Sequence, residues 1–228
     1  RAVGASIRAS SRVEETAILT VTSDNETVGL EVLDGGSTGR ALTIAALNGE
    51  FRTVGVLIPA GRGFNLESSS ITRVSARIGD AEGVSAEGVD FGVLLEAATL
   101  VDVRIADVSG FRAAGMRMRQ QTTADRVVIT DVTGTAGSQG DGVTTYGMQF
   151  DGGLATVRAC VLSKIGDPEA GVVGIEIGVG SISGTEVSEL DGGQQATGVL
   201  IDFSSEGVLN VADSNVRDVA SESGTAVG

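Results

Sequence analysis

Gly174-Ile-Glu-Ile177 and Gly198-Val-Leu-Ile201 are two copies of a short motif that decides the fold of this chain. Each copy has a glycine, an apolar residue, a variable residue and a second apolar residue. The motif recurs about every 28 residues, and its eight copies begin at Gly29, Gly55, Gly92, Gly115, Gly147, Gly174, Gly198 and Gly224. Apolar residues that alternate with a period of two predict a β-strand with one buried face. We expect the glycine to form a tight or left-handed corner before each strand.

A second apolar pattern precedes the glycine motif in the repeats. The segments Val157–Ile165 and Val211–Val219 carry apolar, small and polar residues at the same offsets. Two or three short strands in each repeat, in register with the next repeat, predict one coil of a solenoid. Parallel strands stack about 4.8 Å apart, so about eight to nine coils would form a rod about 40 Å long. The sequence therefore predicts a single all-β solenoid over residues 1–228.

This pattern resembles the right-handed parallel β-helix superfamily, the fold of pectate lyases, tailspikes and many surface proteins. The resemblance covers nearly the whole chain and implies a single-stranded right-handed parallel β-helix. It implies no activity, because a fold alone does not specify a function. The Gly-His-Gly motif of polygalacturonase-like enzymes is absent, since the chain has no histidine. Of the pectin methylesterase motif Asp-Phe-Ile-Phe-Gly, only Asp90-Phe91-Gly92 is present, so no catalytic residue is carried over from these families.

Irregular spacing of the motif predicts where the solenoid carries longer loops. The two longest intervals contain Gly-rich stretches, and we expect loops near residues 61–70, 79–90 and 134–145. The chain begins with Arg1 and shows no signal peptide. We therefore expect it to be a fragment or a mature, processed form.

Composition and charge exclude several classes of protein. The formal net charge is −14, which disfavours binding to nucleic-acid phosphates and to anionic membranes. No apolar run approaches the roughly 20 residues of a membrane-spanning helix. A single cysteine and no histidine exclude a disulfide framework within the chain and imidazole chemistry. We place Cys160 in the core as a small apolar residue, because no base is present to activate its thiol.

A column of polar residues supplies the best pair of carboxylates for catalysis. Asp107 and Asp131 are expected on neighbouring coils, about 5 Å apart, which is similar to the carboxylate spacing of retaining glycosidases. The same column continues through Lys164, Glu189 and Asp218. We favour the alternative that these residues form a stacked charge ladder, in which cross-strand pairs stabilise the turn.

The acidic, glycine-rich stretch Gly79–Asp90 is the candidate for a calcium site. Calcium takes six to eight oxygen ligands, which here would come from Asp80, Glu82, Glu87 and Asp90. Their spacing matches no known calcium-loop signature. We therefore favour a solvated loop without a bound metal or cofactor.

Two surface features are candidates for binding. Arg117 and Arg119 alternate with buried methionines, so they point outward, where they could hold the carboxylates of an acidic glycan or of a neighbouring subunit. The alternative is a set of salt bridges to Glu96 and other acids within the ladder. Leu57 and Leu94 are expected side by side on the surface, as an apolar contact face.

The two ends of the solenoid suggest self-association. No amphipathic capping helix is visible at either end, and open strand edges recruit other strands. Head-to-tail contacts through such ends generate filaments, with Ile7 and Val227 as the expected contact residues. Our first hypothesis is a non-enzymatic, extracellular or cell-surface structural or adhesive solenoid, which assembles end to end or forms part of a longer rod. The alternative is a β-helix protein that binds or cleaves polysaccharide.

Overall fold

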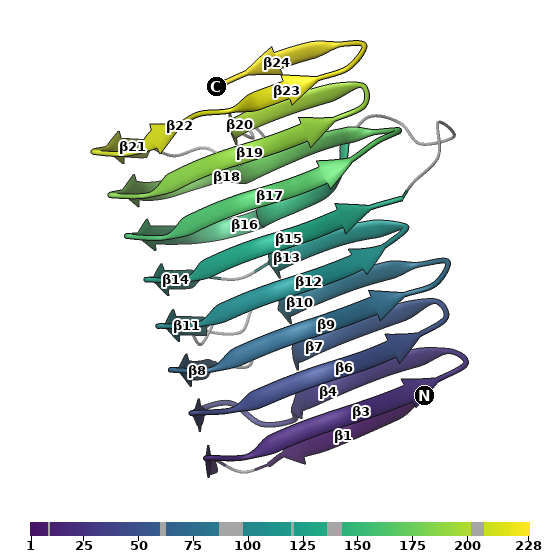
Figure 1. Cartoon of the computed structure of the whole chain (residues 1–228). Coiled ribbons are helices and arrows are strands. Elements are labelled where there is room, and N and C mark those ends of the chain that lie inside the picture. Colours follow the sequence, from purple (N-terminus) through teal and green to yellow (C-terminus); the bar gives the residue numbers. More distant parts are fainter. Residues whose placement is uncertain (9, 60–62, 87–97, 120, 136–142, 202–207) are drawn as a thin grey trace.

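The chain folds as a parallel β-solenoid of stacked coils (Figure 1). The computed structural model describes residues 1–8, 10–59, 63–86, 98–119, 121–135, 143–201 and 208–228. These described residues contain strands and no helix. The parallel β-solenoid predicted from the repeat is thus confirmed.

Each coil contributes strands to three ladders, and strands of neighbouring coils pair in parallel. The first ladder contains β1 (Ala2–Ile7), β4 (Glu26–Val32), β7 (Arg52–Ile58), β10 (Asp80–Ala86), β13 (Arg112–Met118), β20 (Gln195–Ile201), β24 (Thr225–Val227) and the beginnings of β16 (Val143–Arg158) and β18 (Gly171–Ser183). The second ladder contains β2 (Arg12–Glu14), β5 (Ser37–Arg40), β8 (Phe64–Glu67), β11 (Ala98–Val101), β14 (Thr122–Asp125), the ends of β16 and β18, and β21 (Leu209–Ala212). The third ladder contains β3 (Ala17–Ser23), β6 (Thr43–Gly49), β9 (Ser70–Ala76), β12 (Arg104–Gly110), β15 (Val128–Gly134), β17 (Val161–Asp167), β19 (Glu186–Gly192), β22 (Asn215–Val216) and β23 (Val219–Ser221).

Two long strands join the first and second ladders into one sheet. β16 and β18 run from the first ladder into the second without a break, which gives a 15-stranded sheet beside the nine-stranded third ladder. The solenoid makes about seven turns, slightly fewer than the eight to nine expected. At the ends of the solenoid, β2, β22, β23 and β24 are only two or three residues long.

Strands occupy parts of the stretches that were expected to be loops. β8 occupies residues 64–67 and β10 occupies residues 80–86, so part of one predicted loop and the first half of another are strand, whereas residues 60–62 and 87–97 lie outside the described residues. Residues 143–145 of the third predicted loop belong to β16, and residues 136–142 lie outside the described residues. The error at β10 has a simple cause. Ala81 and Val84 face the core there, and Gly83, not Gly92, carries the glycine motif in register.

The recurrent glycine has a different role from the one predicted. Pairing of Val28 with Val54 and of Leu30 with Val56 places Gly29 opposite Gly55, inside the strands and not at a corner. The same register gives a row of nine residues, which we call the glycine row: Gly4, Gly29, Gly55, Gly83, Gly115, Gly147, Gly174, Gly198 and Gly228. In the last repeat, the glycine aligned with the glycine row is therefore Gly228 and not the expected Gly224. In the same way, Gly83 is the aligned glycine where Gly92 was expected.

Close approach of two sheets explains the glycine row. A Cβ atom on Gly55 would lie 2.5 Å from Cγ2 of Ile71 in the third ladder and 2.3 Å from the carbonyl oxygen of Gly83 on the next coil. Gly83 and Gly115 meet Ile105 and Ile129 in the same way. Glycine is required because no side chain fits between the ladders at this level.

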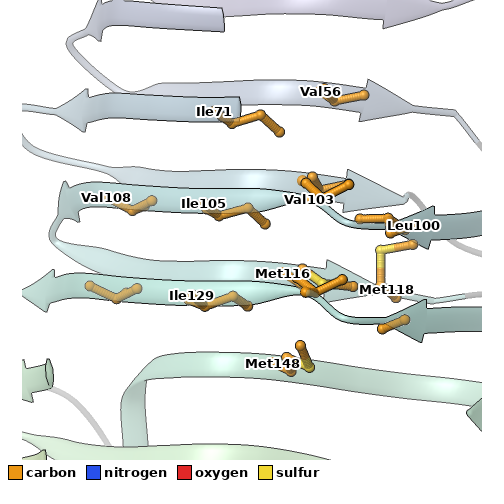
Figure 2. Packing of buried hydrophobic residues seen from close by; sticks show 14 of the residues in the cluster. Val56, Ile71, Leu100, Val103, Ile105, Val108, Met116, Met118, Ile129 and Met148 are labelled. Atoms are coloured by element: carbon orange, nitrogen blue, oxygen red, sulfur yellow. The ribbon is translucent and has the colours of Figure 1, made fainter. Parts of the chain in front are cut away.

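The core is a stack of apolar columns along the solenoid axis. Figure 2 shows Ile71, Ile105 and Ile129 on successive coils of the third ladder, with Met116 and Met148 from the first ladder nearby. All five side chains are fully buried. Burial of each contributes about 1.5–3 kcal/mol, so each coil is stabilised mainly by its contacts with its two neighbours.

Candidate functional site

The column that contains Asp107 and Asp131 lies on the outer face of the third ladder. Ala106 pairs with Thr130 and Val108 with Val132, so the two aspartates are opposite each other on β12 and β15. Both have left-handed backbone conformations, with φ of 55° and 57°. The column repeats this conformation once per coil, at Thr20, Ala46, Arg73, Asp107, Asp131, Lys164, Glu189 and Asp218.

The contacts of Asp131 agree with a charge ladder. The Nζ atom of Lys164 lies 3.8 Å from Oδ1 of Asp131, and the Thr130 hydroxyl donates to Oδ2 at 2.9 Å. Asp107 is exposed, whereas a carboxyl group that acts as a general acid is usually held in an apolar pocket. The geometry therefore favours the structural interpretation, and catalysis by this pair stays an untested prediction.

Arg117 and Arg119 belong to a chain of salt bridges along the outer face of the first ladder. Arg117 contacts Glu82 at 3.4 Å and Asp151 at 3.5 Å, and Arg119 contacts Asp151 at 3.1 Å. We call the whole set the ion-pair network: Arg1, Glu26, Glu31, Arg52, Glu82, Arg117, Arg119 and Asp151. Both arginines thus have carboxylate partners within the solenoid. Glu96, the partner considered from the sequence, lies outside the described residues.

Glu82 lies at the centre of the ion-pair network. Its side chain is only 4% exposed and accepts a hydrogen bond from Arg52 at 3.0 Å. Nearby, burial raises the pKa of the Asp80 carboxyl above its usual value, and the negative charge of Glu82 adds to this effect. Burial also raises the pKa of Tyr146 to about 12, with a further contribution from Glu176.

This arrangement offers little to a calcium ion. Asp80 and Glu82 lie on a strand, and Glu82 already neutralises two guanidinium groups. Glu87 and Asp90, the other two candidate ligands, lie outside the described residues. Within the described ranges, no group of three or more acidic or cysteine residues is placed to hold a metal ion.

The predicted apolar contact face is wrong at Leu57. Leu57 is 3% exposed and packs with Val28 and Val54 in a small cluster outside the main core. It faces Ser85 on the next coil, whereas Leu94 lies outside the described residues. The prediction failed because it assumed that the outer face of a strand is solvated, and β7 is buried on both faces.

At the corner between the second and third ladders, an inward column carries a small hydroxyl residue on some coils. Ser69 accepts from the backbone N–H of Leu42 at 3.0 Å and donates to the carbonyl of Glu67 at 2.7 Å. Thr185 makes the same pair of bonds with Cys160 and Ser183. Where a hydroxyl residue stands at this corner, it therefore satisfies backbone groups of its own coil and of the neighbouring coil.

Cys160 stands in this column and is buried, as expected. Its thiol donates to the carbonyl of Arg158 at 3.3 Å, and burial raises the thiol pKa above its usual value. Because the thiolate is the reactive form, we expect iodoacetamide to alkylate Cys160 at pH 8 at least about tenfold more slowly in the folded protein than in 8 M urea. Mass spectrometry of timed samples measures both rates. Equal rates would contradict the buried placement.

A groove on the outer face of the third ladder was missed by sequence analysis. It consists of two adjoining hollows of about 350 and 270 Å³ that share Asn48 and Ser75. Its lining comes from β3, β6, β9, β12 and the corners that follow them: Thr22, Ser23, Asp24, Ala46, Asn48, Gly49, Glu50, Arg73, Ser75, Arg77, Asp107 and Ser109. We call this feature the axial groove, because it crosses successive coils. A column of outward polar residues at Thr22, Asn48, Ser75 and Ser109 was the available signal.

No described segment forms a helix long and apolar enough to cross a membrane. Comparison with known families, with curated proteins and with solved structures finds no match for this chain. What characterises it is therefore the parallel β-solenoid itself, with an ion-pair network on one outer face and the axial groove on another.

Proposed function

We propose that this chain is a non-enzymatic structural and adhesive rod, located outside the cell or on its surface, whose coils are continued at their ends by further coils. The proposal rests on apolar residues at the C-terminal end of the stack, which is marked C in Figure 1. Val211 and Val227 are exposed there, and Val216 and Val219 only partly cover the core. An apolar layer of this kind, with unpaired strand edges, is stabilised by another coil laid on it.

The register of the two ends supports end-to-end stacking. Ala2-Val3-Gly4 and Ala226-Val227-Gly228 occupy the same three positions relative to the glycine row. If β1 of a second copy follows β24, Val227 faces Val3 of that copy, as Val28 faces Val3 within one chain. The ladders then continue in parallel, and contacts of this head-to-tail kind form filaments.

The arrangement of charge supports a mechanical role over a catalytic one. The arginines and acids of the ion-pair network neutralise each other along six coils of the first ladder. Backbone hydrogen bonds between successive coils and this network together resist bending and fraying. The alternative of an acidic-glycan site at Arg117 and Arg119 is less favoured, because Asp151 and Glu82 already occupy both guanidinium groups.

Assembly is tested by replacing an apolar residue at the end of the stack. We expect the purified chain to form particles longer than about 40 Å, the length that ladder spacing gives for one solenoid. Val211→Asp and Val227→Asp should shorten them, because each buries a charge between stacked coils. Negative-stain electron microscopy and sedimentation velocity across protein concentration measure the effect. Ile7 is a poor probe, since it is buried in the core and its replacement by aspartate would unfold the first coil.

Leu154→Asp is the matched control, since Leu154 is exposed on β16 in the middle of the stack. It should leave particle length unchanged. Uniform particles of single-solenoid length at every concentration would overturn end-to-end assembly.

A further inference from the structure

The axial groove is lined in part by polar side chains that have no partner among the described residues. Within the described part of the chain, the side chains of Asn48, Arg73 and Asp107 make no hydrogen bond or ion pair with one another or with any other residue. Arg73 and Asp107 lie directly opposite each other on β9 and β12. Polar groups that line a hollow and lack internal partners are available to a ligand.

A row of exposed apolar side chains borders the groove. Phe51, Ile78 and Phe111 are 53%, 49% and 38% exposed. Backbone hydrogen bonds from Ile78 to Glu50 and from Phe111 to Gly79 place the three residues on successive coils. The two phenylalanines are thus two ladder steps apart, about 10 Å along the axis. Their chain neighbours Glu50 and Arg77 line the groove itself, so the apolar row and the polar lining form one surface.

The charges of the groove point to a neutral ligand. Its lining has two arginines, Arg73 and Arg77, against three acids, Asp24, Glu50 and Asp107. Arg77 is also paired with Glu50. With a chain charge of −14 in addition, a polyanion would be repelled. A peptide strand is not favoured either, because the groove lies on the face of a sheet whose backbone groups are paired with neighbouring coils, and strand addition needs a free edge.

We propose that the axial groove binds an uncharged oligosaccharide that runs along the solenoid axis. Sugar hydroxyls would exchange hydrogen bonds with Asn48, Ser75 and Ser109. The apolar C–H faces of the sugar rings would pack on Phe51 and Phe111, because aromatic faces carry partial negative charge and attract such polarised hydrogens. This inference rests on the proposed adhesive role of the rod and names the class of ligand that the rod would adhere to.

Binding is tested by isothermal titration calorimetry with four neutral hexasaccharides, namely cellohexaose, xylohexaose, laminarihexaose and maltohexaose, and with hexagalacturonate as the acidic comparison. We expect at least one neutral chain to bind, and Phe51→Ala combined with Phe111→Ala to weaken its affinity by about tenfold or more, which corresponds to about 1.4 kcal/mol. Asn48→Ala should weaken it as well. Leu154→Ala, which removes an exposed apolar side chain elsewhere, should have no effect.

Several outcomes would overturn the inference. They are no binding by any neutral chain, equal binding after the double phenylalanine substitution, and binding of hexagalacturonate alone. Particle length in the electron microscope is measured on the same variants. Because Phe51 and Phe111 lie away from the ends of the stack, they should leave length unchanged, so failure of glycan binding and failure of rod assembly are separate results.

Discussion

Alanine in place of Gly55 is expected to lower the free energy of unfolding by about 3 kcal/mol, at the upper end of the range for overpacked cores. The added methyl group would lie 2.3 Å from the carbonyl oxygen of Gly83 and 2.5 Å from Cγ2 of Ile71. Neither neighbour can retreat easily, since one is backbone and the other is fully buried. The first and third ladders must separate at this coil, which also strains the coils above and below. Urea denaturation followed by circular dichroism measures the loss.

Two further variants show whether close approach is the cause. Gly166→Ala is the matched control, because a Cβ atom there meets only the carbonyl oxygen of Asp191, at 3.5 Å, and should change stability by less than about 0.5 kcal/mol. Gly55→Ala combined with Ile71→Ala should give no full rescue, since the contact with the Gly83 carbonyl remains. Equal stability of Gly55→Ala and the natural chain would show that the two ladders do not depend on a glycine there.

The glycine row also shows what the sequence could and could not predict. Alternation of apolar residues after a repeated glycine was enough to predict parallel coils, because burial on one face leaves a period of two. It was not enough to set the register at Gly83, where the small residue Ala86 takes the second apolar position of the motif. The motif at Gly92 matched the pattern better by composition. Only pairing with β7 and β13 identifies Gly83 as the aligned residue.

The functional surfaces depended on information that no single repeat contains. Arg117 was correctly placed on an outer face, but its partners Glu82 and Asp151 are each more than 30 positions away in sequence. Leu57 occupies the same outward column as Arg117, yet one is buried and the other is half-buried. Period-two alternation assigns a side chain to a face, and cannot tell which faces are covered. The axial groove was missed for the same reason, since it arises from several coils together.

Removing both arginines that contact Glu82 is expected to destabilise the chain more than removing the charge of Glu82 itself. In Arg52→Met with Arg117→Met, the carboxylate stays almost fully buried without a positive partner, and loss of one side of such a pair costs about 3 kcal/mol or more. Methionine keeps the apolar stem of arginine, so the lost packing is small. Glu82→Gln should cost only about 1 kcal/mol, because the amide has nearly the same shape and both arginines keep other partners, Glu26 and Asp151.

The triple variant, with all three substitutions, shows whether the double arginine variant loses stability through the buried charge of Glu82 or through lost packing. If the buried charge causes the loss, adding Glu82→Gln to the double arginine variant should recover most of the stability, with a coupling energy of about 2 kcal/mol. Arg217→Met is the control for an exposed pair. Arg217 contacts Glu186 and Asp218 at the surface, where salt bridges contribute less than about 1 kcal/mol. If the triple variant were instead less stable than the double variant, the outer face of the first ladder would be held by packing of the arginine stems and not by neutralisation of Glu82.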